Sequence, residues 1–372
     1  TGSQQLGLTA AISQSLAALD WLRVQGARQY YFKYCSTFDS TDQGNIGPVA
    51  DAMLDALGED FTVFNPAFPT NKRTIYKGHL FVGDELLSES GMRNHPLTPM
   101  TDPLLPRVLQ RQTPHKVGAL HVATVEQGVP ALKDAFRDFR ARGVRHVVLD
   151  SLTDAHLKTL GEACADLRLV TGGSGMAMGL PANFVRQGLM TGGSAVRLPR
   201  IDGPTAVLAG SCSVATLAQV AHMKKDHEAF EIDPERLATG DDLAARALDW
   251  AGARLSARPV LIYSTATPEK VKRVQEKLGR EHAGAMVEET MSKIARGLAA
   301  LGVRKIVVAG GETSGAVVGA LGVEGLHIGR EIDPGVPWTA SIGSPAMALA
   351  LKSGNFGTED FFTKAFRLLD EA

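Results

Sequence analysis

Short apolar runs rich in β-branched and aromatic residues alternate along this chain with longer segments whose apolar positions recur at helical spacing. Runs of this length are typical of buried strands, and the intervening helices can return the chain to the same edge of a sheet. The alternation therefore predicts an α/β fold, built as two α/β domains with largely parallel sheets. The expected strands are Tyr30–Tyr34, Phe61–Phe64, Val117–Val122, His146–Leu149, Leu167–Val170, Ala206–Ala209, Val260–Tyr263, Lys305–Ala309 and Ala346–Leu351.

One segment contains neither a short apolar run typical of a strand nor apolar residues at helical spacing. Between Met190 and Pro204 the sequence MTGGSAVRLPRIDGP contains glycine and proline turns but no helical period, which is typical of a linker between domains. We expect an N-terminal domain at residues 1–195 and a C-terminal domain at residues 196–372. Ligand sites in two-domain proteins favour the cleft between the domains, so we expect an interdomain active-site cleft.

The start of the N-terminal domain is unusual for this fold class. A helix is predicted at Ile12–Val24, with Gly26 as its stop signal, and it follows the first residues almost directly. No strand is predicted before this helix. Either the domain has no strand there, or further residues precede Thr1.

Composition narrows the class of partner. The chain carries 39 lysines and arginines against 40 acids, so its net charge is too small to attract nucleic acid or an anionic membrane. Small molecules are therefore the expected partners. Its three cysteines, Cys35, Cys164 and Cys212, argue against a disulfide framework and for a reducing compartment. No apolar run reaches the roughly 18–20 residues of a membrane helix, and no secretory signal opens the chain. A cytoplasmic enzyme is expected, although a cytoplasmic binding protein would have the same composition.

Glycine-rich turns follow four of the expected strands. They are Thr171–Gly175 in the N-terminal domain and Gly210–Ser213, Gly310–Ser314 and Lys352–Gly357 in the C-terminal domain. Loops of neighbouring strands converge at the carboxyl edge of a parallel sheet. Glycine lets the backbone approach a ligand, and hydroxyls together with the N–H groups of a helix start can hold phosphate oxygens. One such turn is more often a tight connection, but three in one domain predict a site for a phosphorylated nucleotide.

The candidate nucleotide-binding residues of these turns are Ser211, Ser213, Gly310, Gly311, Glu312, Thr313, Ser314, Lys352, Ser353 and Gly354. Glu312 could help to hold magnesium, directly or through water, or it could be an acid favoured by the helix dipole. The segment Lys352–Gly354 could equally be a solvated turn. The glycine fingerprint of dinucleotide-binding domains and the Walker A pattern are both absent from the sequence.

The N-terminal domain carries a polar string after its first expected strand. It contains Lys33, Ser36, Asp39, Ser40 and Thr41. A lysine can bind the carboxylate of a small sugar acid, while an acid and hydroxyls can bind its hydroxyl groups. The alternative is an ordinary loop in which Ser40 or Thr41 caps a helix.

A second loop of this domain, Asn65–Pro69, is followed by Arg73. An arginine at such a place can clamp a carboxylate with two parallel hydrogen bonds, although it could equally be a surface residue. Asn65 and Arg73 therefore join the candidates for binding an acidic substrate.

Several longer motifs resemble one known family. They are YFKYCSTFDSTDQGNIGPV from Tyr31, FNPAFPTNKRTIYKGHLFV from Phe64, LVTGGSG from Leu169, LAGSCS from Leu208, VVAGGETSGAV from Val307, GVPW from Gly335 and LALKSGNFG from Leu349. In this order, over nearly the whole chain, they resemble the four-carbon acid sugar kinase family. The forms KYCSTFDST and GNIGPV look like the 3-oxo-tetronate kinases rather than the threonate or erythronate kinases.

The resemblance implies an N-terminal domain that binds an acid sugar and a C-terminal domain that binds ATP, with Mg²⁺. The implied reaction transfers the γ-phosphoryl group to the terminal O4 of a 3-oxo-tetronate such as 3-dehydro-erythronate. Asp39 and Lys33 are then the candidate catalytic residues, and the substrate-binding candidates are Ser36, Ser40, Thr41, Asn65 and Arg73. The family opens with a strand and an Asp-Asp-Phe-Thr-Gly segment, which this sequence lacks before Ile12. Thr1-Gly2 could be what remains of that segment, and among the residues present Asp39 is the candidate base.

Two other functions stay open from the sequence. A two-domain cleft could bind a sugar acid and a nucleotide without turnover and act as a sensor, although no helix-turn-helix or basic stripe points to DNA. A nicotinamide-dependent dehydrogenase is disfavoured because its glycine fingerprint is missing. The stereochemistry of the acid, the direct magnesium ligands and the formation of a homodimer are also left open.

Overall fold

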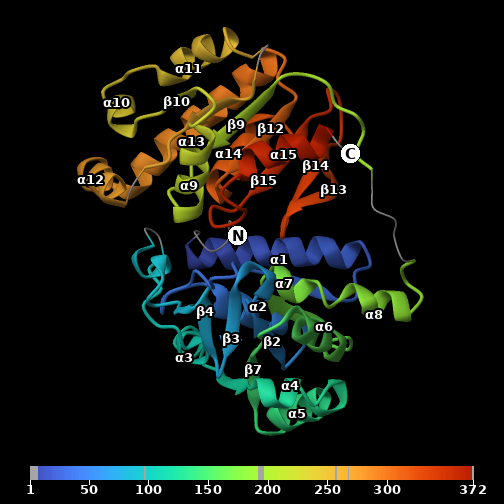
Figure 1. Cartoon of the computed structure of the whole chain (residues 1–372). Coiled ribbons are helices and arrows are strands. Elements are labelled where there is room, and N and C mark those ends of the chain that lie inside the picture. Colours follow the sequence, from blue (N-terminus) through green and yellow to red (C-terminus); the bar gives the residue numbers. More distant parts are fainter. Residues whose placement is uncertain (1–6, 96–97, 192–196, 256–257, 267, 371–372) are drawn as a thin grey trace. The chain divides into compact units, whose positions relative to one another are not determined.

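The expected strands form two separate sheets in the computed structural model, which describes residues 7–95, 98–191, 197–255, 258–266 and 268–370 (Figure 1). The chain divides into two compact units, Thr1–Gly193 and Ser194–Ala372, called here the N-terminal and C-terminal units. Thr1, Gly2 and residues 192–196 of the expected linker lie outside the described residues.

The N-terminal unit is built on a parallel five-stranded sheet in the order β1-β8-β2-β7-β6. Both β2 and β8 are buried along their whole length, because helices cover both faces of the sheet. The strands are β1 (Tyr30–Lys33), β2 (Thr62–Asn65), β6 (Lys116–Leu120), β7 (Val144–Leu149) and β8 (Leu169–Gly172).

Two hydrophobic cores cover the two faces of this sheet. Phe64, Val148 and Leu169 belong to one core, together with residues of α1 (Leu8–Val24), α2 (Ile46–Leu57) and α3 (Leu105–Gln110). Val63, Val147 and Leu149 belong to the other, which includes residues of α4 (Val122–Val125), α5 (Val129–Ala141), α6 (Asp154–Ala163) and α7 (Ser174–Ala177). The short helix α8 is Pro181–Arg186. Strand residues that follow one another thus supply opposite cores, as the pleat requires.

A small antiparallel sheet is inserted between β2 and α3. Its strands are β3 (Arg73–Tyr76), β4 (His79–Val82) and β5 (Glu85–Leu86), and the 3-10 helices η2 (Pro69–Asn71) and η3 (Gly91–Asn94) flank it. A bridge between Ile75 and Ser151 ties this insertion to the loop after β7. The insertion therefore lies over the carboxyl edge of the main sheet.

The C-terminal unit has a seven-stranded sheet in the order β10-β11-β9-β12-β15-β14-β13. The first five strands are parallel, and β14 and β13 continue the sheet in antiparallel orientation. The strands are β9 (Thr205–Ala209), β10 (Ala229–Glu231), β11 (Val260–Tyr263), β12 (Lys305–Ala309), β13 (Leu326–Asp333), β14 (Val336–Ser341) and β15 (Ala348–Lys352).

Helices cover both faces of this second sheet as well. One core includes residues of α11 (Leu243–Gly252), α13 (Arg280–Ala300) and α14 (Gly311–Ala320), and the other includes residues of α9 (Val214–Met223) and α15 (Phe361–Asp370). The remaining helices are α10 (Pro234–Ala238) and α12 (Pro268–Leu278). The carboxyl ends of β9, β12 and β15 lie next to one another in the sheet.

The α/β class and the largely parallel sheets predicted from the pattern are confirmed, and each expected strand overlaps a strand of the structure. Val122, expected to end a strand, instead begins α4. The helix expected at Ile12–Val24 is α1. The three cysteines are free. No helix in the described part of the chain is both long and apolar enough to cross a membrane.

Candidate functional site

The three glycine-rich turns of the C-terminal unit meet at one edge of its sheet. The amide nitrogens of Gly210 and Ser211 donate to the carbonyl of Ala309 at 3.0 and 3.2 Å, and Gly310 N donates to the carbonyl of Lys352 at 2.9 Å. Each turn is thus hydrogen-bonded to the end of the neighbouring strand. The candidate nucleotide-binding residues therefore lie together, although they come from three segments that are distant in the sequence.

Glycine is required in these turns because hydroxyl groups occupy the space of a side chain. A Cβ on Gly210 would lie 2.2 Å from Thr313 Oγ1, and a Cβ on Gly354 would lie 2.2 Å from Ser211 Oγ. Gly310 has a φ of +130°, which residues with a side chain rarely adopt. The turns therefore interlock through backbone and small hydroxyl side chains.

Helix α14 begins at the centre of this arrangement. A Cβ built on Gly311 meets no atom within 4 Å, so the first turn of the helix has open space beside it. The hydroxyl of Ser314 is buried, and no described residue forms a hydrogen bond with it. Glu312 is exposed in the same turn. The N–H groups of a helix start carry partial positive charge and favour phosphate oxygens.

A polar stripe on α9 fixes the turn that follows β15. Ser213 caps α9 and donates to the carbonyl of Gly354 at 2.6 Å, and Thr216 Oγ1 donates to the same oxygen at 2.9 Å. Gln219 Nε2 lies 3.0 to 3.2 Å from the carbonyl oxygens of Phe356, Gly357 and Thr358. These side chains are spaced three residues apart, so they follow one side of the helix. The turn is held by its carbonyl groups.

Lys352 is buried beneath this turn. Its side chain is 1% exposed, and Nζ donates to Thr216 Oγ1 at 3.1 Å and to the carbonyls of Ser353 and Gly354 at 3.0 Å each. Burial lowers the pKa of Lys352 to about 7. The interpretation of Lys352 as part of a solvated turn is therefore wrong, although Ser353 is exposed.

The carboxylate of Glu312, in the first turn of α14, interacts electrostatically with groups on other elements. Burial raises the pKa of Glu288 on α13, and the carboxylate of Glu312 raises it further. Burial likewise raises the pKa of the Cys212 thiol, with Glu312 adding to the shift. Glu312 is therefore within electrostatic reach of both groups. Carboxylate oxygens are the hard ligands that Mg²⁺ prefers, so this acid fits a role in holding a magnesium ion carried by a nucleotide.

In the N-terminal unit the loop after β1 adopts an uncommon backbone conformation. Phe38 and Asp39 have positive φ values of 64° and 42°, which residues with a side chain adopt rarely and which are often found at functional sites. Thr37 Oγ1 donates to the Asp39 carboxylate at 2.6 Å. The carboxylate is thus held in a defined position.

The charged candidate site residues of this unit interact electrostatically. Arg73 is 8% exposed; its burial lowers the pKa of its guanidinium group, and the Asp39 carboxylate opposes that shift. Burial also raises the pKa of the Cys35 thiol, where Asp39 adds to the shift and the exposed Lys33 opposes it. Asp39 is therefore within electrostatic reach of Arg73 and Cys35, and Lys33 is within reach of Cys35. Ser36 is half-buried in the same loop.

Three other substrate candidates are tied to protein groups. Asn65 is fully buried, and its amide donates to the carbonyl of Leu149 and to Ser151 Oγ at 2.9 and 2.8 Å. Ser40 Oγ and the carbonyl of Thr41 accept hydrogen bonds of 2.9 and 2.6 Å from one amide, Gln112 Nε2. The side chain of Gln112 thus holds this loop in place. Asn65 and Ser40 position loops, and neither is presented at the surface.

The glycine-rich turn of the N-terminal unit is filled by protein. A Cβ on Gly173 would lie 2.7 Å from the carbonyl oxygen of Pro66, and one on Gly175 would lie 2.3 Å from that of Ala67. These glycines let the loop after β2 pack against the turn after β8. Close packing against this loop therefore explains why the turn is rich in glycine.

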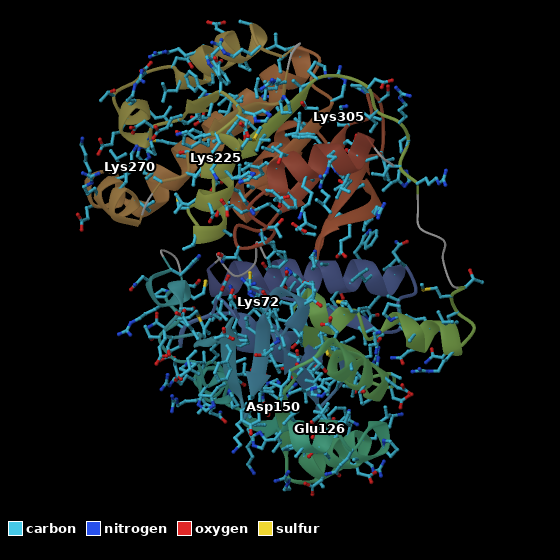
Figure 2. All side chains as sticks on the ribbon, in the orientation of Figure 1. Lys72, Glu126, Asp150, Lys225, Lys270 and Lys305 are labelled. Carbon is cyan, nitrogen blue, oxygen red and sulfur yellow. The ribbon has the colours of Figure 1, made fainter. Side chains whose placement is uncertain are left out.

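Asp150, at the end of β7, was not singled out from the sequence. It is fully buried and accepts hydrogen bonds from the backbone N–H groups of Lys77 at 2.7 Å, Gly78 at 2.8 Å and Val122 at 3.1 Å. Figure 2 labels its position in the N-terminal unit. His121 Nδ1 lies 3.4 Å from the same carboxylate. Asp150 thus joins the β3–β4 hairpin to the carboxyl edge of the main sheet.

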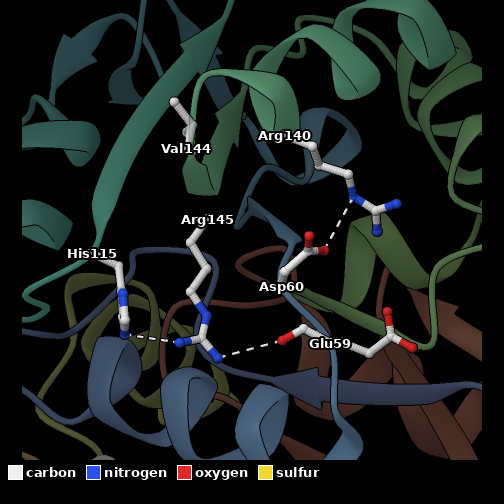
Figure 3. A pocket seen from close by; sticks show the side chains of 7 residues that line it. Glu59, Asp60, His115, Arg140, Val144 and Arg145 are labelled. Atoms are coloured by element: carbon white, nitrogen blue, oxygen red, sulfur yellow. Dashed lines mark hydrogen bonds and ion pairs between the residues drawn. The ribbon is translucent and has the colours of Figure 1, made fainter.

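A cavity of about 310 Å³ lies elsewhere in the N-terminal unit. Its wall includes Asp60, Arg140 and Arg145, which lie before or at the amino ends of strands or on α5. Both arginines interact with neighbouring protein groups: Arg140 Nε lies 3.5 Å from Asp60, and Arg145 donates to His115 Nε2 at 2.8 Å and to the carbonyl of Glu59 at 3.4 Å (Figure 3). Ligands of open α/β sheets bind at the carboxyl edge. The cavity is therefore not the candidate site.

Sequence reasoning missed Thr216 and Gln219 among the residues that shape the site. The only available signal was their spacing, three and six residues after Ser213. Such spacing on an otherwise apolar helix places polar groups along one side.

Two family models match the chain. The model described as a sugar-binding N-terminal domain matches residues 1–180, and the model described as a nucleotide-binding C-terminal domain matches residues 206–362.

Curated relatives match over nearly the whole chain. A Burkholderia multivorans protein named 3-oxo-tetronate kinase is 59% identical over 371 residues, covering 100% of this chain and 86% of the relative. A Brucella melitensis protein of the same name is 47% identical over 363 residues, covering 97% of this chain and 83% of the relative.

Two crystal structures have a similar fold at 44% sequence identity. One, from Salmonella typhimurium LT2, has a TM-score of 0.81 and covers 98% of this chain and 87% of its own. The other, from Haemophilus influenzae, has a TM-score of 0.71 and covers 99% of this chain and 88% of its own.

Proposed function

Because this chain belongs to the four-carbon acid sugar kinase family, we propose that it uses ATP to phosphorylate the 4-hydroxyl of a 3-oxo-tetronate, most simply 3-dehydro-erythronate. Family membership and the class of enzyme, a carbohydrate kinase, were both expected from the motifs and are confirmed by the curated relatives. The observation that carries the proposal is the meeting of the turns after β9, β12 and β15 at one sheet edge. The sensor without turnover gains no support.

The C-terminal unit is assigned the nucleotide. The open space beside Gly311 and the N–H groups of the first turn of α14 suit the phosphate chain. The predicted residues around it are Ser211, Ser213, Gly310, Glu312, Thr313, Ser314, Ser353 and Gly354. Lys352 contributes from beneath the turn, since its Nζ is buried. Glu312 is the residue that would hold magnesium, whose charge neutralises phosphate oxygens during transfer.

The N-terminal unit is assigned the acid sugar. Arg73 and Lys33 suit its carboxylate, because an arginine and a lysine both form charge-assisted hydrogen bonds with carboxylate oxygens. Asp39 is the candidate base for the proton of the attacking 4-hydroxyl. Ser36 and Thr41 are the remaining candidates for its hydroxyl groups, while Asn65 and Ser40 act by positioning loops.

Catalysis in such a site rests on positioning and on neutralising charge. A loose phosphoryl transition state leaves the protein little covalent chemistry, so orientation of the 4-hydroxyl and stabilisation of phosphate oxygens carry the rate. The Asp39 carboxylate would accept the proton as the new oxygen–phosphorus bond forms and the bond to ADP breaks. The interdomain cleft, the domain limits at residues 195 and 196, a cytoplasmic location and a homodimer stay predictions.

The reaction is tested by measuring ADP release in a coupled assay with ATP, Mg²⁺ and a panel of four-carbon acids. We expect a 3-oxo-tetronate to stimulate release well above the acid-free rate, and phosphorus NMR to show a 4-phosphate product. Release that no acid stimulates would contradict the proposal.

A matched pair of glycine variants tests where the nucleotide binds. Gly311 and Gly319 are both exposed on α14, and an added Cβ meets no atom within 4 Å at either position. Gly311→Leu should raise the KM for ATP about tenfold or more, since the side chain would enter the space assigned to phosphate. Gly319→Leu should leave it unchanged. Equal KM values for the two variants would remove the start of α14 from the site.

A further inference from the structure

The ammonium group of Lys352 meets three neutral oxygens and is shielded from water. An ammonium has three N–H donors, and the oxygens of Thr216, Ser353 and Gly354 lie 3.0 to 3.1 Å away. Within the described part of the chain, no carboxylate forms an ion pair with it, and burial is the cause of its lowered pKa of about 7. A buried lysine without an acid is costly to keep charged.

The titratable groups on the elements around Lys352 do not offset the effect of burial on its pKa. The strand β14 contributes none. The others are Cys212 in the turn after β9, His222 on α9 and Lys224 and Lys225 at its end, Lys305 on β12, Glu312 on α14, Glu359 and Asp360 in the loop after β15, and Lys364 and Arg367 on α15.

We propose that Lys352 takes up a proton when nucleotide binds, so that the buried ammonium fixes the Gly354 carbonyl and adds positive charge behind the turn. This inference rests on the proposed nucleotide site. Lys352 is accordingly a positioning residue, which acts on the nucleotide through the turn.

The geometry explains why the proton and the turn are coupled. A neutral amine has two N–H donors, so one of the three oxygens loses its hydrogen bond from Lys352 when Lys352 is deprotonated. The peptide after Gly354 is planar, and its N–H points away from the carbonyl that Ser213, Thr216 and Lys352 hold. Fixing the carbonyl therefore fixes the direction of the N–H on the opposite side.

A bound phosphate chain favours the charged lysine in return. A phosphate charge within about 8 Å raises a lysine pKa by roughly one to two units at the effective dielectric constant of a protein. Binding and protonation then strengthen each other by the same factor. Because pH 8 lies above the lowered pKa of Lys352, most of this lysine is neutral in the free protein at that pH, whereas the phosphates of the nucleotide are already ionised, with a second pKa near 6. The proton is drawn from the buffer.

The test is isothermal titration calorimetry of the full chain with MgADP at pH 8 in two buffers of different ionisation enthalpy. The wild-type protein should take up about half a proton or more per nucleotide. Lys352→Met should bind with little or no uptake. Lys225→Met, which removes an exposed lysine at the end of α9 (Figure 2), should match the wild type.

The wild-type protein alone provides a second readout. Its affinity for MgADP should fall between pH 7 and 9 by about five- to twenty-fivefold, at roughly three- to sevenfold per pH unit at the steepest point. MgADP binding that is independent of buffer and pH would overturn the inference and leave the nucleotide site standing. Failure of the wild type to bind MgADP at any pH would overturn both.

Discussion

Ser213 Oγ donates a hydrogen bond of 2.6 Å to the carbonyl oxygen of Gly354, 141 residues later in the chain. The same hydroxyl accepts a hydrogen bond from the backbone N–H of Thr216 at 3.2 Å and so caps α9. One small side chain therefore fixes both the start of a helix and the turn after β15. The turns assigned to the nucleotide thus depend on each other for their shape.

Removing this hydroxyl should affect stability and nucleotide affinity together. Ser213→Ala should lower the free energy of unfolding by about 0.5–2 kcal/mol, the usual range for loss of a helix cap. It should also raise the KM for ATP several-fold, because the Gly354 carbonyl loses a donor. Urea denaturation measures the free energy of unfolding, and steady-state kinetics measure the KM for ATP.

Asp242→Ala is the matched control for this prediction. Asp242 caps α11 in the same unit and accepts from Ala245 N at 3.0 Å. Its loss should cost about the same stability and leave the KM for ATP unchanged. A similar KM for ATP in both variants would show that the Ser213–Gly354 hydrogen bond does not affect nucleotide binding.

Burial of Lys352 makes the stability of the C-terminal unit depend on pH. Its pKa of about 7 in the folded protein lies below the unfolded value of 10.5, so between these values the unfolded state binds more protons. Stability therefore rises with pH in this window, by at most about 1.4 kcal/mol per pH unit. From pH 7 to 9 the wild type should gain about 2 kcal/mol relative to Lys352→Met in urea denaturation. A constant difference between the two proteins would mean that Lys352 has an ordinary pKa.

The candidate base is tested by removing its charge alone. Asp39→Asn preserves the shape of the residue that accepts from Thr37, but an amide cannot take the proton of the 4-hydroxyl. We expect kcat to fall by about 10²- to 10⁴-fold, the usual range for a general base, with a smaller effect on the KM for ATP. A kcat near that of the wild type would show that another group accepts the proton.

Arg73 should govern affinity for the acid rather than for the nucleotide. Arg73→Met should raise the KM for the four-carbon acid by about ten- to hundredfold, because a charge-assisted hydrogen bond to the carboxylate is lost. The exposed surface variant Arg137→Met provides the control. If the KM for the acid stayed the same in both variants, the carboxylate would bind elsewhere.

Asp150 should be a determinant of stability. Asp150→Asn would turn an amide N–H toward backbone donors that now meet a carboxylate, and we expect unfolding to become easier by about 2–4 kcal/mol. Asp84→Asn, at an exposed position near the same hairpin, should have little effect. Thermal and urea unfolding of both variants distinguishes these outcomes, and equal stabilities would contradict the structural role.

The strands were predictable where hydrophobic runs are buried on both faces. The strand β11 was predicted with its observed limits at Val260–Tyr263, because each of its residues is buried. The antiparallel strand β13, Leu326–Asp333, was missed because it contains charged, partly exposed residues and Gly329. Such a strand at a sheet edge lacks the continuous apolar run on which the predictions rested.

The position of the site was more predictable than the role of each residue. Gly311 and Ser213 could be found from the turns because glycine and small hydroxyl residues have few local alternatives at strand ends. The burial of Lys352 and Asn65 could not be predicted, because it depends on partners such as Thr216 and Leu149 from other segments. Local sequence therefore identified the turns, and tertiary contacts decided which side chains are buried.

The most direct test of the account is a crystal structure of the protein with Mg²⁺ and a nonhydrolysable ATP analogue. We predict that the phosphate chain lies against the start of α14, within hydrogen-bond distance of backbone N–H groups of Gly311–Thr313 and beside the turns at Ser211 and Gly354. A phosphate chain bound away from all three turns would contradict the account.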